Sequence, residues 1–305
     1  MGEGTCERRS VIVTGAGRGL GRAHALELAR QGASVVVNDL GVDLDGSGGS
    51  PSPADDVAAE IRAAGGEAIS NADDVADFDA AEHLVANAVA AFGHLDAVVN
   101  NAGHVRDRMF VNTTEDEWDS VIRVHLKGHF SVAHWAAVHW RDQHKSGGTV
   151  DARIVNTSSG AGLVGSVGQA AYSAAKAAIA ALTLVQAAEL GRYGVTANAL
   201  APSARTRMTE AVFAETMAAP TEPGAFDAMA PENVSPLVAW LCSAGSHGVT
   251  GQVLEVEGGR ITLMSGWNRA CTATKAGRWE ASELGPIVAE LLARAPAGLR
   301  VYGTQ

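Results

Sequence analysis

The chain has 305 residues, of which 47% are hydrophobic and 19% are charged, so it carries enough apolar material for a buried core and is not a disordered chain. A formal net charge of −11 argues against nucleic acid or an anionic membrane as the main partner, because both require a basic face. The three cysteines are widely spaced, and no apolar run approaches the roughly 18 residues of a membrane span, which together predict a cytoplasmic protein without a disulfide framework.

Short β-branched runs alternate with longer Ala-rich amphipathic stretches from residue 10 onward, as in a chain of β-α-β units. The runs are nearly continuous in apolar residues, which is typical of strands covered on both faces. Strands are predicted at 10–14, 34–38, 67–70, 95–100, 153–158, 195–200 and 252–257. Helices are predicted at 19–31, 54–64, 77–92, 115–143, 172–192 and 231–243. The fold class is therefore α/β, with one doubly wound parallel sheet of about seven strands and helices on both faces.

Two segments interrupt this alternation. Residues 41–53 are rich in Gly, Ser and Pro and are predicted to form a surface loop after the second strand. Residues 258–305 follow the last predicted strand and contain a short helix at 281–294. We therefore expect one dinucleotide-binding domain over 1–260 and a C-terminal extension over 261–305 that packs on it near the substrate mouth.

A glycine cluster follows the first strand directly and leads into a helix. Gly15, Gly19 and Gly21 give the pattern G-x-x-x-G-x-G, which supplies a tight turn and free N–H groups at a helix N-terminus. These are the features that bind a pyrophosphate. A strand-to-helix turn can need glycine without any ligand, but the position after the first strand favours a dinucleotide site.

Asp39 ends the second strand, 24 positions after Gly15, where an acidic residue is expected to hold the adenosine ribose hydroxyls. A carboxylate there accepts hydrogen bonds from the 2′-hydroxyl and repels a 2′-phosphate. Asp39 therefore favours NAD over NADP, although a turn-capping role is the alternative and Arg18 is a possible phosphate-binding counterweight.

Tyr172 and Lys176 are four residues apart at the start of a predicted helix, so both project from one face. A nearby ammonium favours the phenolate form of a tyrosine, which proton transfer to or from an alcohol requires. Ser159 lies 13 residues earlier, just after a predicted strand, where its hydroxyl can donate to a substrate carbonyl. A pair at this spacing often occurs by chance on a helix surface, and the serine is what supports a catalytic interpretation.

Taken together, these motifs resemble the short-chain dehydrogenase/reductase family over roughly residues 8–260. The motifs that carry the resemblance, in chain order, are TGAGRGLG at 14–21, Asp39, Asp74-Val75, Asn100-Asn101-Ala102-Gly103, Ser159 and Tyr172-x-x-x-Lys176. The resemblance implies a Rossmann-type fold in which Tyr172 is the general acid/base, Lys176 lowers its pKa and binds the nicotinamide ribose, and Ser159 polarises the reacting carbonyl.

The resemblance also implies a set of residues that contact the cofactor. These are Gly15, Arg18, Gly19, Leu20, Gly21, Asp39, Asp74, Val75, Asn101, Ala102, Gly103, Val124, Tyr172, Lys176, Pro202, Ser203 and Thr206.

Two positions depart from the common family pattern. His125 stands where many members carry an Asn that holds a water for proton relay, and an imidazole can still donate or accept one hydrogen bond. It is therefore a candidate fourth catalytic residue. After the sixth strand the frequent Pro-Gly is Pro202-Ser203, and a frequent Thr is replaced by Arg207, which leaves Thr206 or Thr209 to contact the carboxamide.

Further segments resemble one branch of the family, the (3R)-hydroxyacyl-CoA dehydrogenase unit of peroxisomal-type multifunctional enzymes. These segments are VNDLG at 37–41, RDRMF at 106–110, VHLKG at 124–128 and APSARTRMT at 201–209. The implied function is NAD-dependent interconversion of a secondary alcohol and a ketone on a bulky apolar substrate, a 3-hydroxyacyl-CoA or a hydroxysteroid. An NADPH-dependent 3-oxoacyl or carbonyl reductase and a non-catalytic dinucleotide-binding regulator are the alternatives.

Several other features suggest ligands or partners of lower specificity. His125, His129, His134, His139 and His144 lack the spacing of a zinc site, so we expect no metal and take them as partly exposed helix residues. Met208, Phe213, Met217, Phe226 and Met229 could line an apolar pocket, and Arg106, Arg108, Arg205 and Arg207 could contact CoA phosphates. The Ala-rich stretch 170–190 suits close helix packing, and with the family resemblance it predicts a homodimer or homotetramer.

Overall fold

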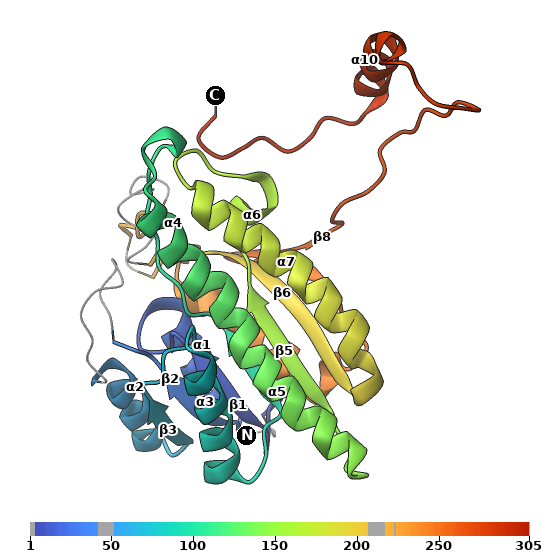
Figure 1. The fold of residues 1–305 in the computed structure, drawn as a ribbon. Coiled ribbons are helices and arrows are strands. Elements are labelled where there is room, and N and C mark those ends of the chain that lie inside the picture. Colours follow the sequence, from blue (N-terminus) through green and yellow to red (C-terminus); the bar gives the residue numbers. More distant parts are fainter. Residues whose placement is uncertain (1–3, 42–51, 207–216, 223, 305) are drawn as a thin grey trace.

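The computed structural model describes residues 4–41, 52–206, 217–222 and 224–304. These residues form one sheet of eight strands in the order β3-β2-β1-β4-β5-β6-β7-β8 (Figure 1). The strands are β1 (Ser10–Thr14), β2 (Ser34–Asn38), β3 (Glu67–Asn71), β4 (Ala97–Asn100), β5 (Ala152–Thr157), β6 (Val195–Ser203), β7 (Val253–Glu257) and β8 (Arg260–Met264). All neighbours run parallel except β7 and β8, which are antiparallel. The predicted α/β fold with a doubly wound sheet is confirmed.

Helices cover both faces of this sheet. One face packs against α1 (Gly19–Arg30), α2 (Ser52–Ala63) and α9 (Ser235–Cys242), and the other against α3 (Phe78–Phe92), α5 (Gly128–Lys145) and α7 (Ala170–Leu190). Two core clusters lie between these layers, one on each side of the sheet. Because both faces are covered, every residue of β1 and β5 is buried, as the continuous apolar runs of the sequence predict.

The strand order reverses between β1 and β4, which lie next to each other in the middle of the sheet. In open α/β sheets the crevice outside the carboxyl ends of the strands at such a switch point is where ligands bind. The glycine turn after β1 and the segment from Asn101 after β4 meet at this crevice, so the topology brings together motifs that lie far apart in the sequence.

The predicted helix over 115–143 is wrong in one respect, because it is not continuous. α4 (Glu115–Ile122) passes into a π-helical turn, Arg123–Lys127, before α5 begins. A π-turn inserts one extra residue into the helical ladder and often occurs at functional sites. The hydrophobic periodicity of the sequence does not reveal it, and it places His125 on the inner side of the turn, where it is buried.

β8 is an additional strand that lies within the segment the sequence assigns to the C-terminal extension. It pairs with β7 through a tight connection at Gly258 and extends the sheet past residue 260. Beyond it, the predicted helix over 281–294 is present as a 3₁₀ turn, Ala281–Glu283, followed by α10 (Leu284–Arg294). In Figure 1 α10 lies away from the sheet, and the chain then returns to α6 (Gly160–Val164).

Several predicted features lie wholly or partly outside the described residues. Residues 42–51 of the predicted loop are among them, as are Arg207, Met208, Thr209 and Phe213.

Among the described helices, α7 alone is long and apolar enough to cross a membrane by length and composition. In the fold this helix packs against β6, β5 and α6, and its first turns carry Tyr172 and Lys176. Because 28% of this apolar window is buried, packing on the sheet accounts for only part of its apolar composition.

Candidate active site

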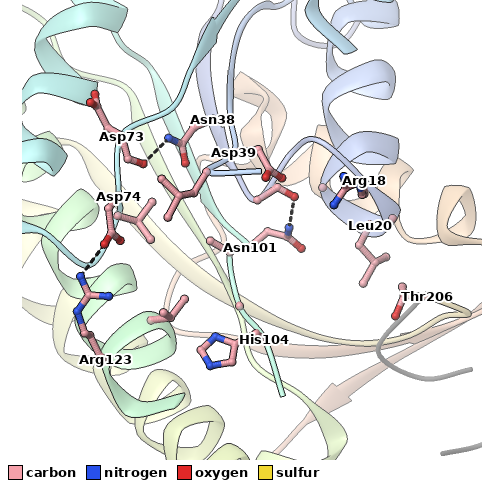
Figure 2. A pocket seen from close by; sticks show the side chains of 18 of the residues that line it. Arg18, Leu20, Asn38, Asp39, Asp73, Asp74, Asn101, His104, Arg123 and Thr206 are labelled. Carbon is pink, nitrogen blue, oxygen red and sulfur yellow. Dashed lines mark hydrogen bonds and ion pairs between the residues drawn. The ribbon is translucent and has the colours of Figure 1, made fainter. Parts of the chain in front are cut away.

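A cleft of about 240 Å³ opens at the switch point of the sheet (Figure 2). Thirteen of the predicted cofactor contacts line it, namely Gly15, Arg18, Gly19, Leu20, Gly21, Asp39, Asp74, Val75, Asn101, Ala102, Gly103, Val124 and Thr206. Pro202, Ser203, Tyr172 and Lys176 do not line this cleft. The cleft lining is where the sequence motifs and the tertiary structure agree most closely.

The glycine turn is built for close approach. Gly15 and Gly19 have φ values of +62° and +53°, which favour glycine. A Cβ atom on Gly15 would lie 2.8 Å from the Cα of Ala102, and one on Gly21 would lie 2.1 Å from the carbonyl oxygen of Gly15. α1 begins immediately after Arg18, whose side chain does not cap the helix. The first residues of α1 line the cleft, so the N–H groups of its first turn lie at the cleft wall.

Asn101 holds the two sides of the cleft together. Its side-chain amide donates to the carbonyl oxygens of Thr14 at 3.0 Å and Gly15 at 3.2 Å. Its backbone N–H donates to the Thr14 hydroxyl at 2.9 Å. The end of β4 is therefore fixed against the glycine turn after β1.

Asp39 projects into the cleft at the end of β2. Its Oδ2 accepts a hydrogen bond from the Gly17 N–H at 2.8 Å, and its Oδ1 accepts one from the Gly41 N–H at 2.7 Å. A carboxylate held by two backbone donors has a fixed orientation and still has lone pairs for a ligand hydroxyl. The structure thus places a fixed negative charge where the sequence predicts the ribose contact.

Asp74 lies across the cleft from the glycine turn and pairs with Arg123. The Arg123 guanidinium donates to Asp74 Oδ2 at 2.6 Å (Figure 2). Asp74 Oδ1 accepts from the Ala76 N–H at 2.9 Å. Arg123 is the first residue of the π-helical turn, so this ion pair ties the turn to the end of β3. Half of the Arg123 side chain is accessible, and we treat the pair as orienting Asp74 more than as stabilising the fold.

Ser159, Tyr172 and Lys176 come together beside this cleft. Ser159 caps α6, and its Oγ accepts from the Ala161 N–H at 3.2 Å. Burial raises the pKa of Tyr172, and the nearby Ser159 side chain opposes this shift. The predicted serine and tyrosine are therefore neighbours in the fold, although 13 residues separate them in the sequence.

Lys176 is 2% exposed, and its Nζ donates to the carbonyl oxygen of Thr157 at 2.6 Å. The same Nζ lies 5.6 Å from the centroid of the Tyr172 ring. Burial lowers the pKa of Lys176 to about 7. Lys176 is therefore not a surface charge. It is buried, it is held by a β5 carbonyl, and it lies one helical turn from Tyr172, where its charge can affect the tyrosine pKa.

His125 contacts Tyr172 edge-on, with ring centroids 5.2 Å apart and an interplanar angle of 85°. Its Nε2 lies 2.6 Å from the carbonyl oxygen and 3.2 Å from the backbone nitrogen of His104. We assign the proton to Nε2 because the shorter contact, to a carbonyl oxygen, needs a donor. Nδ1 is then a buried acceptor, with no hydrogen-bond partner among the residues the structure describes. Burial, and then the Lys176 charge, hold the pKa of His125 well below its usual value.

Gly103 makes this position of His125 possible. A Cβ atom on Gly103 would lie only 2.1 Å from the imidazole Cε1, so only glycine lets the ring lie against the segment after β4. His129, one turn further along the helix, accepts a hydrogen bond from the Thr157 N–H at 3.4 Å. Both histidines are 1% exposed, so the prediction that they are partly exposed helix residues is wrong for these two.

Within the described ranges, no group of three or more His, Cys, Asp or Glu side chains is arranged to hold a metal ion.

The arginines proposed as CoA contacts differ in their surroundings. Arg205 pairs with Asp227, and Arg108 pairs with Glu117 at 3.0 Å. Their charges are therefore largely compensated. Met217, Phe226 and Met229 are described, and Phe226 is 67% exposed, so it does not pack against the sheet.

The cleft also contains residues that the motifs do not predict. These are Asn38, Leu40, Asp73, His104, Ser120 and Arg123. Asn38 and Leu40 flank Asp39 in the sequence, so their position next to a predicted contact is a usable signal. Arg123 and Ser120 lie on α4 and the π-turn, and only the path of that helix across the cleft brings them there.

A model of the short chain dehydrogenase family matches residues 9–216 of this chain. Hydroxyacyl-CoA dehydrogenase ChsB1 of Mycobacterium tuberculosis is 51% identical over 257 residues, which are 83% of this chain and 78% of that protein. Peroxisomal multifunctional enzyme type 2 of Mus musculus is 43% identical over 92% of this chain, which corresponds to 34% of that longer protein. A crystal structure of a short chain dehydrogenase from Mycobacterium avium superposes with a TM-score of 0.89 at 60% identity, covering 99% of this chain and 100% of that one.

Proposed function

This chain belongs to the short-chain dehydrogenase family and is an oxidoreductase acting on CH–OH groups, and we propose that it is an NAD-dependent dehydrogenase of 3-hydroxyacyl-CoA substrates. The observation that carries the proposal is the clustering of Ser159, Tyr172 and Lys176 next to a glycine-lined cleft that also contains Asp39. A dinucleotide-binding regulator has no physical need for those three side chains.

The glycine turn and the N-terminus of α1 give the cleft the features that bind a dinucleotide. Cβ atoms on Gly15 and Gly21 would occupy the turn, and the N-terminus of the twelve-residue helix α1 offers free N–H groups to a pyrophosphate. Members of this family bind NAD or NADP. The fixed Asp39 carboxylate supports NAD, because it accepts hydrogen bonds from ribose hydroxyls and repels a 2′-phosphate.

When bound, the nicotinamide supplies the hydride acceptor for alcohol oxidation. In the proposed reaction, Tyr172 removes the proton from the substrate hydroxyl as a phenolate, while the Ser159 hydroxyl donates a hydrogen bond to the same oxygen. The Ser159 side chain lies near enough to Tyr172 to lower its pKa, which supports a geometry in which one substrate oxygen reaches both groups. In the reverse direction Tyr172 returns the proton to the carbonyl oxygen.

Lys176 makes the phenolate accessible. Burial alone disfavours each charged form, which raises the pKa of Tyr172 and lowers that of Lys176. A phenolate and an ammonium formed together carry no net charge and attract each other in the low-dielectric interior. An ammonium on Lys176 would therefore favour the phenolate of Tyr172 over the neutral phenol.

His125 is proposed to connect this pair to a path for the proton. Its ring contacts Tyr172, its Nε2–H is held by the His104 carbonyl, and its Nδ1 offers a buried lone pair. The Nδ1 acceptor can receive a hydrogen bond from a donor located between His125 and the side chains of Tyr172 and Lys176. We assign it the relay role that an Asn has in many family members.

The substrate class rests on the relatives, several of which are named for hydroxyacyl-CoA or peroxisomal multifunctional activities. A hydroxysteroid is the competing substrate. Because Arg205 and Arg108 are paired with carboxylates, CoA recognition by these two arginines would require the anion to compete with Asp227 and Glu117.

We also propose that the protein is a homodimer or homotetramer working in the cytoplasm. Phe130 of α5 and Leu184 and Val185 of α7 are 43%, 52% and 50% exposed, which leaves apolar area on neighbouring helices for a second copy. The three cysteines, all described, are unpaired, which supports a reducing compartment.

The test is NADH formation from NAD and a panel of 3-hydroxyacyl-CoA esters, a 3-hydroxysteroid and simple secondary alcohols. We expect turnover with the acyl-CoA esters and a kcat/KM for NAD well above that for NADP. Turnover of the steroid alone, or activity with NADPH in the reductive direction alone, would contradict the proposal. Tight NADH binding with no turnover of any substrate would instead support the regulator.

A further inference from the structure

The end of the chain is bound to the segment that joins the two catalytic side chains. The backbone N–H of Val167 donates to the carbonyl oxygen of Tyr302 at 2.9 Å, and the N–H of Tyr302 donates to the carbonyl oxygen of Gly165 at 3.1 Å. These bonds form a parallel bridge between Ser166 and Tyr302. The chain between Ser159 and Tyr172 is thereby covered by residues that lie more than 130 positions later.

Tyr302 reaches to within one residue of Ser159. A Cβ atom on Gly160 would lie 2.5 Å from the Tyr302 hydroxyl oxygen and 2.9 Å from its ring, so a larger residue at position 160 would displace the tyrosine. Burial, together with Glu255 and Glu257, raises the pKa of Tyr302 and keeps its hydroxyl neutral. The tyrosine therefore adds an aromatic wall and one uncharged polar atom beside the proposed carbonyl-binding serine.

A cleft of about 410 Å³ lies between this C-terminal segment and α6. Residues 299–304 form one wall, Gly160, Leu163 and Val164 form the second, and Glu255 and Met264 close it from β7 and β8. Its size falls in the range of small-molecule sites. Gly160, which follows Ser159 in the sequence, lines the cleft, although Ser159 and Tyr172 do not. The cleft therefore lies next to the proposed carbonyl-binding serine.

The lining of this cleft indicates what it takes. Leu163, Val164, Met264, Leu299 and Val301 give it apolar walls. Its charged members, Glu255 and Arg300, are of opposite sign, so it offers no cluster of cations to the phosphates of a nucleotide. A neutral apolar chain fits these walls, and the nucleotide part of a CoA ester does not.

We propose that this cleft is the subsite for the alkyl chain of the substrate, and that Tyr302 and Met264 form walls that a long chain contacts. The inference rests on the proposed function. The reacting carbon would lie between Ser159 and Tyr172. The alkyl chain of the substrate would extend into the cleft beside Gly160, and its thioester end would extend in the opposite direction. The C-terminal segment thus belongs to the substrate site of its own chain.

The experiment compares kcat/KM for a short-chain and a long-chain 3-hydroxyacyl-CoA in the full-length protein. Tyr302→Ala removes the wall, and Met264→Trp fills the cleft from β8. Each is expected to lower the ratio of long-chain to short-chain kcat/KM about tenfold, the order of magnitude by which an apolar pocket discriminates. The matched control is Leu263→Trp, because the neighbouring residue of β8 points to the other face, is 61% exposed and does not line the cleft.

The outcomes separate this inference from the function on which it rests. If the unmodified protein turns over neither ester, the proposed function fails. If it turns over both and the two variants leave the ratio unchanged, or Leu263→Trp shifts it as much as Met264→Trp does, the subsite is wrong. Thermal midpoints of all variants identify any that do not fold, and Met264→Trp tests the cleft without altering the C-terminal segment.

Discussion

The imidazole of His125 lies edge-on against the ring of Tyr172, with ring centroids 5.2 Å apart, inside a π-helical turn that no sequence pattern announces. Gly103 leaves the space for it, and the His104 carbonyl fixes its proton on Nε2. The tyrosine, its lysine and a buried imidazole acceptor thus form one contiguous group, and its chemistry can be tested residue by residue.

Tyr172→Phe should abolish most turnover while leaving cofactor binding intact. The substitution removes only the hydroxyl that exchanges a proton with the substrate, so kcat is expected to fall by about 10²- to 10⁴-fold. NADH fluorescence titration should give an unchanged Kd. A variant that keeps a large part of its activity would remove Tyr172 from the acid/base role.

His125→Ala should lower kcat by roughly tenfold or more, because the buried acceptor beside Tyr172 is lost. His125→Asn should recover much of the loss, since an amide also supplies an acceptor. The measurement is the pH profile of kcat for both variants, with the NADH Kd as a check on the cleft. Equal kcat values for the Ala, Asn and unmodified proteins would show that no relay passes this residue.

Asp39→Asn should reduce the preference for NAD over NADP by about tenfold, corresponding to roughly 1.4 kcal/mol of lost repulsion. The amide keeps an oxygen for the Gly17 or Gly41 N–H, so the turn keeps one of its anchors while the charge is removed. Dissociation constants for the two cofactors measure the effect directly. Ser34→Ala, on the same strand but at its far end, serves as the control.

Lys176→Met should make the cofactor-free protein more stable, and by an amount that depends on pH. Burial lowers the folded-state pKa of Lys176 to about 7, whereas the unfolded value is about 10.4. Between these values the unfolded chain holds more protons, so the unmodified protein loses stability as the pH falls from about 10 to 7. The variant should exceed it by on the order of a few kcal/mol at pH 7 and by less at pH 10.

Urea denaturation of the two proteins at both pH values provides that comparison, because all other titrating groups are common to them. A difference in stability that stays constant with pH would mean that Lys176 is not buried as the neutral amine in the free protein.

Val185→Asp should weaken the proposed assembly. The residue is 50% exposed on α7, so a charge there costs the isolated chain little but is unfavourable inside an apolar interface. Light scattering after gel filtration should show a smaller species at the same protein concentration, with the thermal midpoint recorded to detect misfolding. An unchanged mass would place the subunit contacts elsewhere.

Much of the fold could be read from local patterns, because strands buried on both faces must be continuous in apolar residues. The runs predicted at 10–14 and 34–38 coincide with β1 and β2. β8 was not predicted because an edge strand such as Arg260–Met264 has exposed Ile and Leu side chains and no continuous buried run. The π-turn was not predicted because one additional residue in the hydrogen-bond pattern of a helix barely changes its hydrophobic periodicity.

The candidate site divides in the same way. Gly15, Asp39, Ser159, Tyr172 and Lys176 could be named from the sequence, because the chemistry restricts which residue types stand at those spacings. The structure adds the hydrogen-bond partners that hold these side chains in place, and the partners come from other parts of the chain. The Thr157 carbonyl on Lys176 and the Gly17 and Gly41 N–H groups on Asp39 are examples.

The sequence by itself predicted seven of the eight strands, the glycine turn after β1 and Ser159, Tyr172 and Lys176 as candidate site residues, since each depends on residues close together or on a strict spacing. Only the tertiary structure decided that Arg123 pairs with Asp74, that His125 packs under Gly103 and that Tyr302 packs on Gly160. Those contacts join segments up to about 140 residues apart, and whether two distant side chains meet depends on the packing of every element between them, which no local pattern encodes.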